Sequence, residues 1–454
     1  MTTQPTRIER RELVTWLTLA GVGLTLTWLA VHGGAHLGTA SAPFLGHYRF
    51  HLGPGTLLAP AVAVAVLLAS ARGLLDGLRW GHVLGFGYVA GLAWAVGLAL
   101  VDGPGGLTRA LTFSDDSTGV GHPPGPLLLL GWLREAGLPD LVIGTLLTAV
   151  GLLTVPVVLV AVRGSCGDAA ARAFVPVLVL APYAIWTAVS LDGIVALLGA
   201  TGVMLGERGS KHVRTGWKAA GLTLSAGLVL GVAALFSYSV PWLGLSVVCL
   251  YFARRRPLLH LASGLGALIP VLLATWAGFN WFDGLLTAQA DFAARIEPHR
   301  SALWWSGISL VALLIAAGPA LMASVRKLRN TPGWPFLVGA LVAIHPVLRA
   351  RRVRARRGGA RVAAVLPVAP GGRHGPGTPG GATCTPPTTP GHRRGSHGDG
   401  DRGGRRDPLV SQPRPQVRQK SAFIRYQMKA LFLLVALGPE KVGPATLRAA
   451  TPAR

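Results

Sequence analysis

Charged residues are scarce in this chain of 454 residues: 13% are Asp, Glu, Lys or Arg, whereas 51% are hydrophobic. A soluble globular protein carries about 25% charged residues, so the shortage excludes a soluble fold for most of the chain. Apolar runs of about 18 residues or more recur along the first 345 positions, and a run of that length can cross a bilayer as a helix. The sequence therefore predicts a multi-pass membrane protein.

Cysteine is almost absent as well, with three residues in the whole chain. They form no CxxC pair and have no ligand spacing, so neither a disulfide framework nor a zinc site is predicted. His32/His36 and His47/His51 have the spacing of two metal ligands on a helix, but their segment offers no acidic third ligand. We therefore predict no metal and no cofactor. No P-loop, GxGxxG, HExxH or GxSxG motif occurs in a supporting context, which argues against soluble nucleotide-dependent chemistry.

Acidic residues are few, with 18 Asp and Glu against 43 Lys and Arg, and the net charge is +25. The excess is unevenly placed, because residues 346–454 hold 21 of the Lys and Arg but only 4 of the Asp and Glu. This separates a transmembrane helical domain over 1–345 from a basic tail over 346–454. The tail is rich in Arg, Gly and Pro and has no hydrophobic periodicity, so we expect it to be disordered. Nucleic acid is not an expected partner of the helical domain.

Two explanations account for the tail. It interrupts an apolar run, "GWPFLVGALVAI", after about eleven residues. An out-of-frame reading of GC-rich DNA yields codons for Arg, Gly, Pro and Ala, so our preferred hypothesis is a frameshift near His345. A basic tail attracted to anionic lipid or nucleic acid is the alternative. Hydrophobic spans in the other two reading frames would support the frameshift.

Hydropathy predicts an all-α, polytopic transmembrane bundle of about eleven helices. Their expected ranges are 13–31, 55–72, 83–101, 140–162, 173–190, 192–206, 219–235, 240–253, 258–280, 304–325 and 334–345. If the N-terminus is cytoplasmic, the loops on that side carry 17 Lys and Arg, and the opposite side carries five. Lys and Arg of short loops stay in the cytoplasm, so we expect a cell-membrane protein with a cytoplasmic N-terminus. "RRR" at 254–256 is most simply a topology anchor.

The stretch "SDDSTGVGHPPGPLLLLGW" over 114–132 falls on the expected extracytoplasmic side. Its prolines exclude a helix through His122, and the leucines that follow can begin a short interfacial helix with proline in its first turn. Asp115, Asp116 and His122 would then lie at the mouth of the bundle. In the simplest alternative, the Pro-Pro pair only breaks the chain and the two aspartates are solvated loop residues. Other acidic, histidine and arginine side chains on this side are Asp102, Asp140, Asp192, Asp283, Asp291, Glu297, His299 and Arg300.

Asp192 and two groups of aromatic residues each allow a structural and a functional interpretation. Asp192 in "SLDGI" lies at a predicted membrane boundary. An ionisable group at such a position either has a function or caps the next helix. The aromatics of "FNWFDG" and "SALWWSG" fit the aromatic belt of a membrane protein, and stacking on a sugar ring is the sharper alternative.

Several of these stretches together resemble the polytopic GT-C glycosyltransferases, and more narrowly a bacterial membrane branch of them. They are "GHPPGPLLLLGWLREAGL", "RGSCGDAAARAFVPVLVLAPYAIWTAVSLDG", "FSYSVPWLGLSVV", "FNWFDGLLTAQADFAARIEPHRSALWW" and "GHYRFHLGPGTLLAPAVAVAV". The resemblance covers about residues 10–344 and implies transfer of a sugar, with inversion, from a polyprenyl-phosphate donor on the extracytoplasmic side. The bilayer itself is the other expected partner.

The resemblance also implies roles for individual residues. Such transfer needs a carboxylate base for the acceptor hydroxyl and cations for the leaving phosphate. Asp115 or Asp116 is then the base, and Asp192 contributes to substrate binding. His122, His299 or Arg300 would contact the phosphate, with Asp283 and Asp291 on the acceptor side. The sequence departs from the family in the loop over 32–55, which contains no acidic residue. A transporter or lipid-handling protein without covalent chemistry, and an inactive truncated product, are the alternatives.

Overall fold

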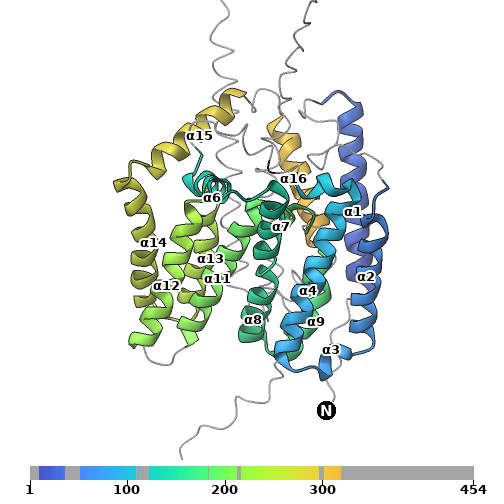
Figure 1. The fold of residues 1–454 in the computed structure, drawn as a ribbon, viewed down its shortest axis with the longest axis horizontal. Helices are drawn as coiled ribbons and strands as arrows, with labels where there is room; N and C mark the ends of the chain where they lie inside the picture. Colours follow the sequence, from blue (N-terminus) through green and yellow to red (C-terminus); the bar gives the residue numbers. More distant parts are fainter. Residues whose placement is uncertain are drawn as a thin grey trace, which may run out of the picture. The chain divides into compact units, whose positions relative to one another are not determined.

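The computed structural model describes residues 10–35, 52–108, 111, 122–181, 184–211, 216–295 and 301–318. All regular secondary structure in these ranges is helical, which confirms the predicted all-α class. The helices, shown in Figure 1, are α1 (Arg10–His32), α2 (Gly55–Ala71), α3 (Leu74–Gly77), α4 (Trp80–Ala99), η1 (Leu100–Asp102), η2 (Pro104–Leu107), α6 (Pro124–Glu135), α7 (Asp140–Gly151), α8 (Thr154–Cys166), α9 (Asp168–Val179), α10 (Ala184–Thr187), α11 (Leu191–Lys211), α12 (Trp217–Ala234), α13 (Val240–Ala253), α14 (Leu258–Trp276), α15 (Trp281–Arg295) and α16 (Ala302–Ala317). The predicted span 334–345 and the tail 346–454 lie outside the described ranges.

Within those ranges, five helical segments are long and apolar enough to cross a membrane. They are Arg11–His32, Trp80–Asp102, Asp140–Cys166, Trp217–Ala234 and Leu258–Trp276. Shorter apolar helices cover Gly55–Ala71 and Leu243–Ala253. These helices are compatible with an integral membrane protein, whereas the predicted count of about eleven is not confirmed.

The predicted helix over 173–190 is wrong in its second half. The helix there, α9, begins at Asp168 and ends at Val179. Pro182 follows, and proline lacks the amide hydrogen that a continuing helix needs at that position. The short helix α10 separates α9 from α11. α9 alone is therefore too short to cross a bilayer.

Two further elements differ in how well the sequence predicts them. α6 begins at Pro124 with proline in its first turn, as the sequence predicts. α15 lies in a stretch that the sequence predicts only as a connection between two spans. Its aspartates and its glutamine lower its hydrophobicity, which explains why a search for apolar runs misses it.

α12 and α14 run parallel and approach each other closely through glycine. A Cβ atom at Gly227 would lie 1.9 Å from the carbonyl oxygen of Ser263, and one at Gly231 would lie 2.4 Å from that of Ala267. Only glycine allows the two backbones to come this near, which is the usual role of small residues between membrane helices. α11 packs on the same helix through Gly202, whose added Cβ would meet Leu230 at 2.6 Å. Glycine contacts thus hold α11, α12 and α14 together.

The first and the last described helices pack on each other. The indole Nε1 of Trp16 in α1 donates a hydrogen bond to the carbonyl oxygen of Leu314 in α16, at 2.8 Å. Gly23 lies against Val311 in the same interface, because an added Cβ would be 2.6 Å from Cγ2 of the valine. The two ends of the described chain are therefore joined side by side (Figure 1).

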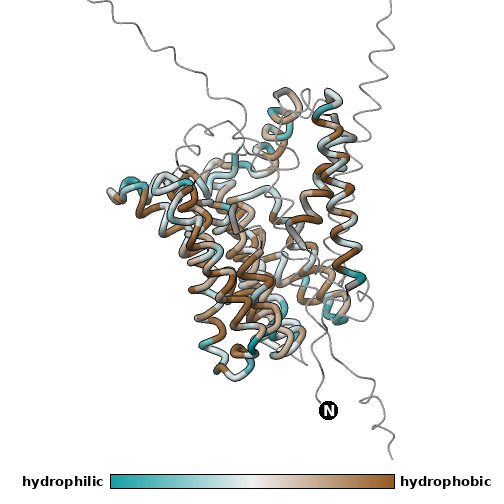
Figure 2. Tube along the Cα trace, turned by 90° about the vertical axis from the view of Figure 1, so that its right-hand side faces the viewer, coloured by the Kyte–Doolittle hydropathy of each residue, from teal (hydrophilic) through white to brown (hydrophobic). Residues whose placement is uncertain are grey.

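The outward faces of the long helices are apolar. α14 exposes Leu261 by 72%, Leu265 by 60% and Leu272 by 61%. Figure 2 shows hydrophobic residues along the helices, with hydrophilic residues gathered mostly toward their ends. A large exposed apolar surface of this kind marks contact with a membrane or another protein.

Candidate functional site at the α6 end of the bundle

The Pro-rich stretch after His122 docks α6 on the connection between α12 and α13. The backbone N–H of Gly125 donates a hydrogen bond to the carbonyl oxygen of Leu235 at 2.9 Å. A Cβ atom at Gly125 would lie 2.6 Å from the ring of Phe236, so a larger residue would push α6 away. His122 itself is half-buried and stands just before the buried Pro123. The "HPPGP" segment over 122–126 thus acts as a docking segment as well as a helix start.

α15 docks on the same connection from another direction. The indole Nε1 of Trp281 donates a hydrogen bond to the carbonyl oxygen of Ala234 at 3.0 Å, and the ring packs edge-on against Tyr238 with centroids 5.1 Å apart. Trp281 is 8% exposed and Tyr238 is 6% exposed. The end of α12 therefore receives one hydrogen bond from α6 and one from α15.

The connection between α12 and α13 carries three hydroxyl groups that are absent from the predicted site residues. The hydroxyl oxygens of Ser237 and Ser239 lie 2.9 Å apart, and the N–H of Ser239 donates to the hydroxyl of Ser237 at 3.3 Å. Tyr238 lies between them in sequence. The signal was available in "FSYSVPW", because three hydroxyl residues within three positions are unusual between two apolar helices.

Asp192 stands in the first turn of α11, behind a strained turn. Val189 has φ = 55°, which is a genuine outlier for a β-branched residue. Its N–H donates to Oγ1 of the fully buried Thr148 at 2.8 Å. The N–H of Asp192 donates to the hydroxyl of Ser190 at 3.1 Å, so Ser190 caps α11. The carboxylate of Asp192 in turn accepts a hydrogen bond from the Ser190 hydroxyl at 3.3 Å.

The packing register relates Asp192 to the connection between α12 and α13. α11 and α12 are antiparallel, since Gly202 lies against Leu230 and Gly209 lies against Thr223. Carried to the start of α11, this register places Asp192 about level with the start of α13. A buried cluster made of Leu111, Leu130, Ile143, Leu147, Val189 and Ile194 underlies α6 and the start of α11. The α6 end of the bundle is therefore a shared platform for the segments that contain His122 and Asp192.

The remaining predicted site residues divide into two groups. Asp283 is exposed, two residues after Trp281, and Asp291 is half-buried further along α15. Eight residues of helix place these two carboxylates about 12 Å apart along the axis of α15. Asp115, Asp116, His299 and Arg300 lie outside the described residues. Among the described residues, no group of three or more His, Cys, Asp or Glu could hold a metal ion.

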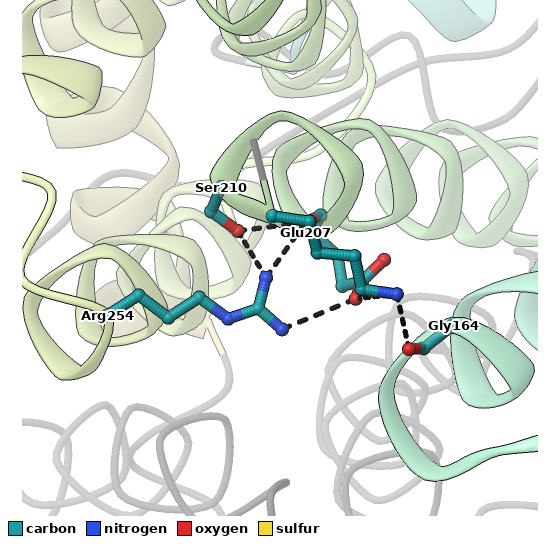
Figure 3. Close-up of polar contacts among 5 residues, drawn as sticks. Gly164, Glu207, Ser210 and Arg254 are labelled. Atoms are coloured by element: carbon teal, nitrogen blue, oxygen red, sulfur yellow. Dashed lines mark hydrogen bonds and ion pairs between the residues drawn. The ribbon is translucent and has the colours of Figure 1, made fainter. Parts of the chain in front are cut away.

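The opposite end of the bundle holds an ion-pair cluster on the buried Glu207, which we call the Glu207 cluster (Figure 3). Oε1 of Glu207 lies 2.9 Å from Nζ of Lys211 and 3.3 Å from Nη2 of Arg254. Nη1 of Arg254 donates to the carbonyl oxygen of Glu207 at 2.9 Å and to the hydroxyl of Ser210 at 2.5 Å. Lys211 also donates to the carbonyl oxygen of Gly164. The cluster joins α8, α11 and α13.

A second ion-pair cluster lies at the turn between α8 and α9. Asp168 pairs with Nε of Arg163 at 2.8 Å and with Nε of Arg172 at 2.5 Å. Nη1 of Arg172 also donates to the carbonyl oxygen of Leu78 at 2.9 Å, after α3. The guanidinium of Arg163 lies 4.4 Å from the ring centroid of Trp80. Arg163 and Gly164 are adjacent, so the two clusters meet on α8.

No protein-family model, no characterised protein and no solved structure matches this chain.

Proposed function

We propose that this integral membrane protein is a GT-C-type glycosyltransferase that uses a polyprenyl-phosphate sugar donor at the α6 end of the bundle. One observation supports this most: α15 donates a hydrogen bond to the last residue of α12, Ala234, and α6 donates one to the next residue, Leu235. The segments that contain His122 and Asp283 thereby adjoin one connection, and the register of α11 adds Asp192 at the same level. A transfer site needs polar groups from separate helices that are held at fixed positions around the substrate, and this connection would hold them.

The surface of α6 suits a lipid-borne donor. Leu127, Leu128 and Trp132 are exposed on a helix that starts with prolines, and Trp132 is 65% exposed. An apolar, aromatic face of this kind is typical of a helix that lies in the membrane interface. A polyprenyl phosphate could then reach the site laterally through the bilayer, with its phosphate at the depth of α6.

The chemistry would be a single displacement at the anomeric carbon. The acceptor oxygen forms the new glycosidic bond while the bond between that carbon and the phosphate oxygen breaks. Asp115 or Asp116 takes the hydroxyl proton, and the electron pair leaves with the polyprenyl phosphate. His122, His299 or Arg300 would stabilise the phosphate, Asp192 and the hydroxyls of Ser237 and Ser239 would orient the sugar, and Asp283 and Asp291 would contact the acceptor.

The test is a transfer assay on membranes that contain the full chain. Radiolabelled polyprenyl-phosphate hexoses and pentoses are supplied, and label in a lipid-free or newly glycosylated product is counted. Asp115→Asn, Asp116→Asn and His122→Ala are compared with Glu135→Gln, an exposed carboxylate at the end of α6. We expect transfer by the wild type and by Glu135→Gln. Each of the other three variants removes a candidate general base or phosphate contact, so we expect its rate of transfer to fall by about 100-fold or more.

The assay also separates the proposal from its main alternative. A transporter or lipid-handling protein would move the labelled lipid between leaflets without forming a product. Product formation that is unchanged in all three variants would show that the site is assigned wrongly. Absence of product from every donor, at normal abundance of the protein in the membrane, would contradict the proposal.

A further inference from the structure

His260, in the first turn of α14, faces a carbonyl oxygen with each of its two ring nitrogens. Nδ1 lies 2.9 Å from the carbonyl oxygen of Pro257, at the start of the same helix. Nε2 lies 3.1 Å from the carbonyl oxygen of Val248, in α13. The half-buried imidazole therefore joins the beginning of α14 to the second half of α13.

These two contacts require more hydrogen-bond donors than a neutral imidazole has. A carbonyl oxygen only accepts hydrogen bonds, so both ring nitrogens would have to donate. A neutral imidazole carries one N–H, whereas an imidazolium carries two. In the neutral form, one nitrogen would point its lone pair at a carbonyl oxygen 2.9 or 3.1 Å away, which is a repulsive contact. The geometry thus fits the protonated ring.

Two aromatic rings of α13 also contact His260. The ring centroid of Phe252 lies 4.5 Å from that of His260, and the ring of Tyr251 meets it edge-on at 5.3 Å. Both distances are within the range in which an aromatic ring attracts a cation. Tyr251 is fully buried, so its ring holds the imidazole from the protein side.

Other charges near this turn act in both directions. The arginines of the turn and the positive end of the α14 dipole oppose a second proton on His260. Arg254 is offset by its ion pair with Glu207, and Arg255 is exposed, so that water screens its charge. The two carbonyl oxygens touch the imidazole directly, where an electrostatic interaction is strongest. The charged groups on the neighbouring elements are Arg254, Arg255 and Arg256 in the turn, Glu207 and Lys211 on α11, and Lys218 on α12.

We propose that His260 is a pH-sensitive clamp, whose protonated ring ties α14 to α13 through the carbonyl oxygens of Val248 and Pro257. Loss of a proton removes one of the two donors and makes that contact repulsive, so the clamp weakens as the pH rises. Arg254 holds the same end of α13 to α11, so release would part α14 from α13 and leave the Glu207 cluster in place. The clamp does not depend on the proposed function.

Hydrogen exchange of the full chain in detergent tests the proposal at about pH 5.5 and about pH 8, which bracket the usual range of histidine. The rates are corrected for the chemical effect of pH on amide exchange. The readout is the turn over 254–260, whose backbone amides donate hydrogen bonds at the ends of both helices. His260→Gln cannot donate to both carbonyl oxygens at either pH. His260→Arg carries several donors and keeps its charge at both. The control is His82→Gln, which removes an exposed histidine of α4.

We expect protection of the turn in the wild type and in the control to fall about tenfold from the lower to the higher pH, because one charge-assisted hydrogen bond is lost. His260→Gln should be poorly protected at both pH values, and His260→Arg well protected at both. Protection that does not change with pH in the wild type would overturn the proposal. So would a pH dependence that persists in His260→Gln. Equally poor protection in His260→Arg would show that the shape of the ring, and not its charge, holds the two helices together.

Discussion

Arg254 Nη2 lies 3.3 Å from Oε1 of Glu207, although 47 residues separate them in the sequence. The side chain of Glu207 is only 2% exposed, and Arg254 and Lys211 are its two cationic partners. A buried carboxylate is tolerated when it is paired and hydrogen-bonded, and removal of its charge leaves the partners uncompensated. The contact fixes the end of α13 against α11.

Replacement of Glu207 by glutamine should therefore destabilise the protein. We expect a loss of about 2 kcal/mol in the free energy of unfolding, less than for a fully buried pair because both cations are partly exposed. Arg208→Gln is the control, since Arg208 is an exposed neighbour on α11 and its loss should cost less than about 0.5 kcal/mol. Thermal melting in detergent compares the two variants, and similar melting temperatures would contradict the role of Glu207.

Substitution of Gly231 by alanine should disrupt the packing of α12 on α14. The new Cβ would lie 2.4 Å from the carbonyl oxygen of Ala267, which is backbone and cannot move aside cheaply. We expect a destabilisation of about 1–3 kcal/mol. Gly221→Ala is matched to it, because a Cβ there meets nothing within 4 Å on the same helix. That variant should be neutral or more stable, and melting temperatures that rank the two the other way would refute the close approach.

Loss of the Thr148 hydroxyl should release the turn before Asp192. Thr148→Val leaves the buried N–H of Val189 without an acceptor, at a cost of about 1–3 kcal/mol. Thr145→Val is the control, since the Thr145 hydroxyl only donates back to the carbonyl of Leu141. Hydrogen exchange by mass spectrometry should show faster exchange over 187–193 in the first variant alone. Equal exchange in both variants would mean that Thr148 does not hold the turn.

Removal of the indole N–H of Trp281 should loosen α15. Trp281→Phe keeps an aromatic ring but leaves the carbonyl oxygen of Ala234 without its donor, so we expect a cost of about 1 kcal/mol. Trp276→Phe serves as its counterpart, because Trp276 is 88% exposed. Limited proteolysis within α15 should accelerate for Trp281→Phe, and no difference between the two variants would argue against the docking contact.

The sequence predicts most of the helices because long apolar runs leave few alternatives to a membrane helix. α1, α2, α4, α12, α13 and α14 lie close to their predicted ranges. The prediction is poorer where the signal is not hydropathy. α9 ends at Val179 although the apolar run still predicts a helix to residue 190, and α15 is too polar to stand out.

The candidate site was predicted less completely than the fold. His122 and Asp192 were singled out from proline and acidic residues next to apolar runs, and α6 was predicted from its prolines. Ser237 and Ser239 were missed, because their importance depends on how α6 and α15 pack on the end of α12. Pairings such as Glu207 with Arg254 depend on packing between distant helices, which local sequence patterns do not report.

A photoactivatable polyprenyl-phosphate analogue offers the most direct test of the proposed transfer site. After irradiation of membranes that contain the full chain, mass spectrometry identifies the peptides that carry the label. We predict labelling of peptides from 122–135 and 235–242, which is reduced by excess unlabelled polyprenyl phosphate. Label confined to 205–218 and 250–261, or label that excess polyprenyl phosphate does not reduce, would contradict a donor site at the α6 end of the bundle.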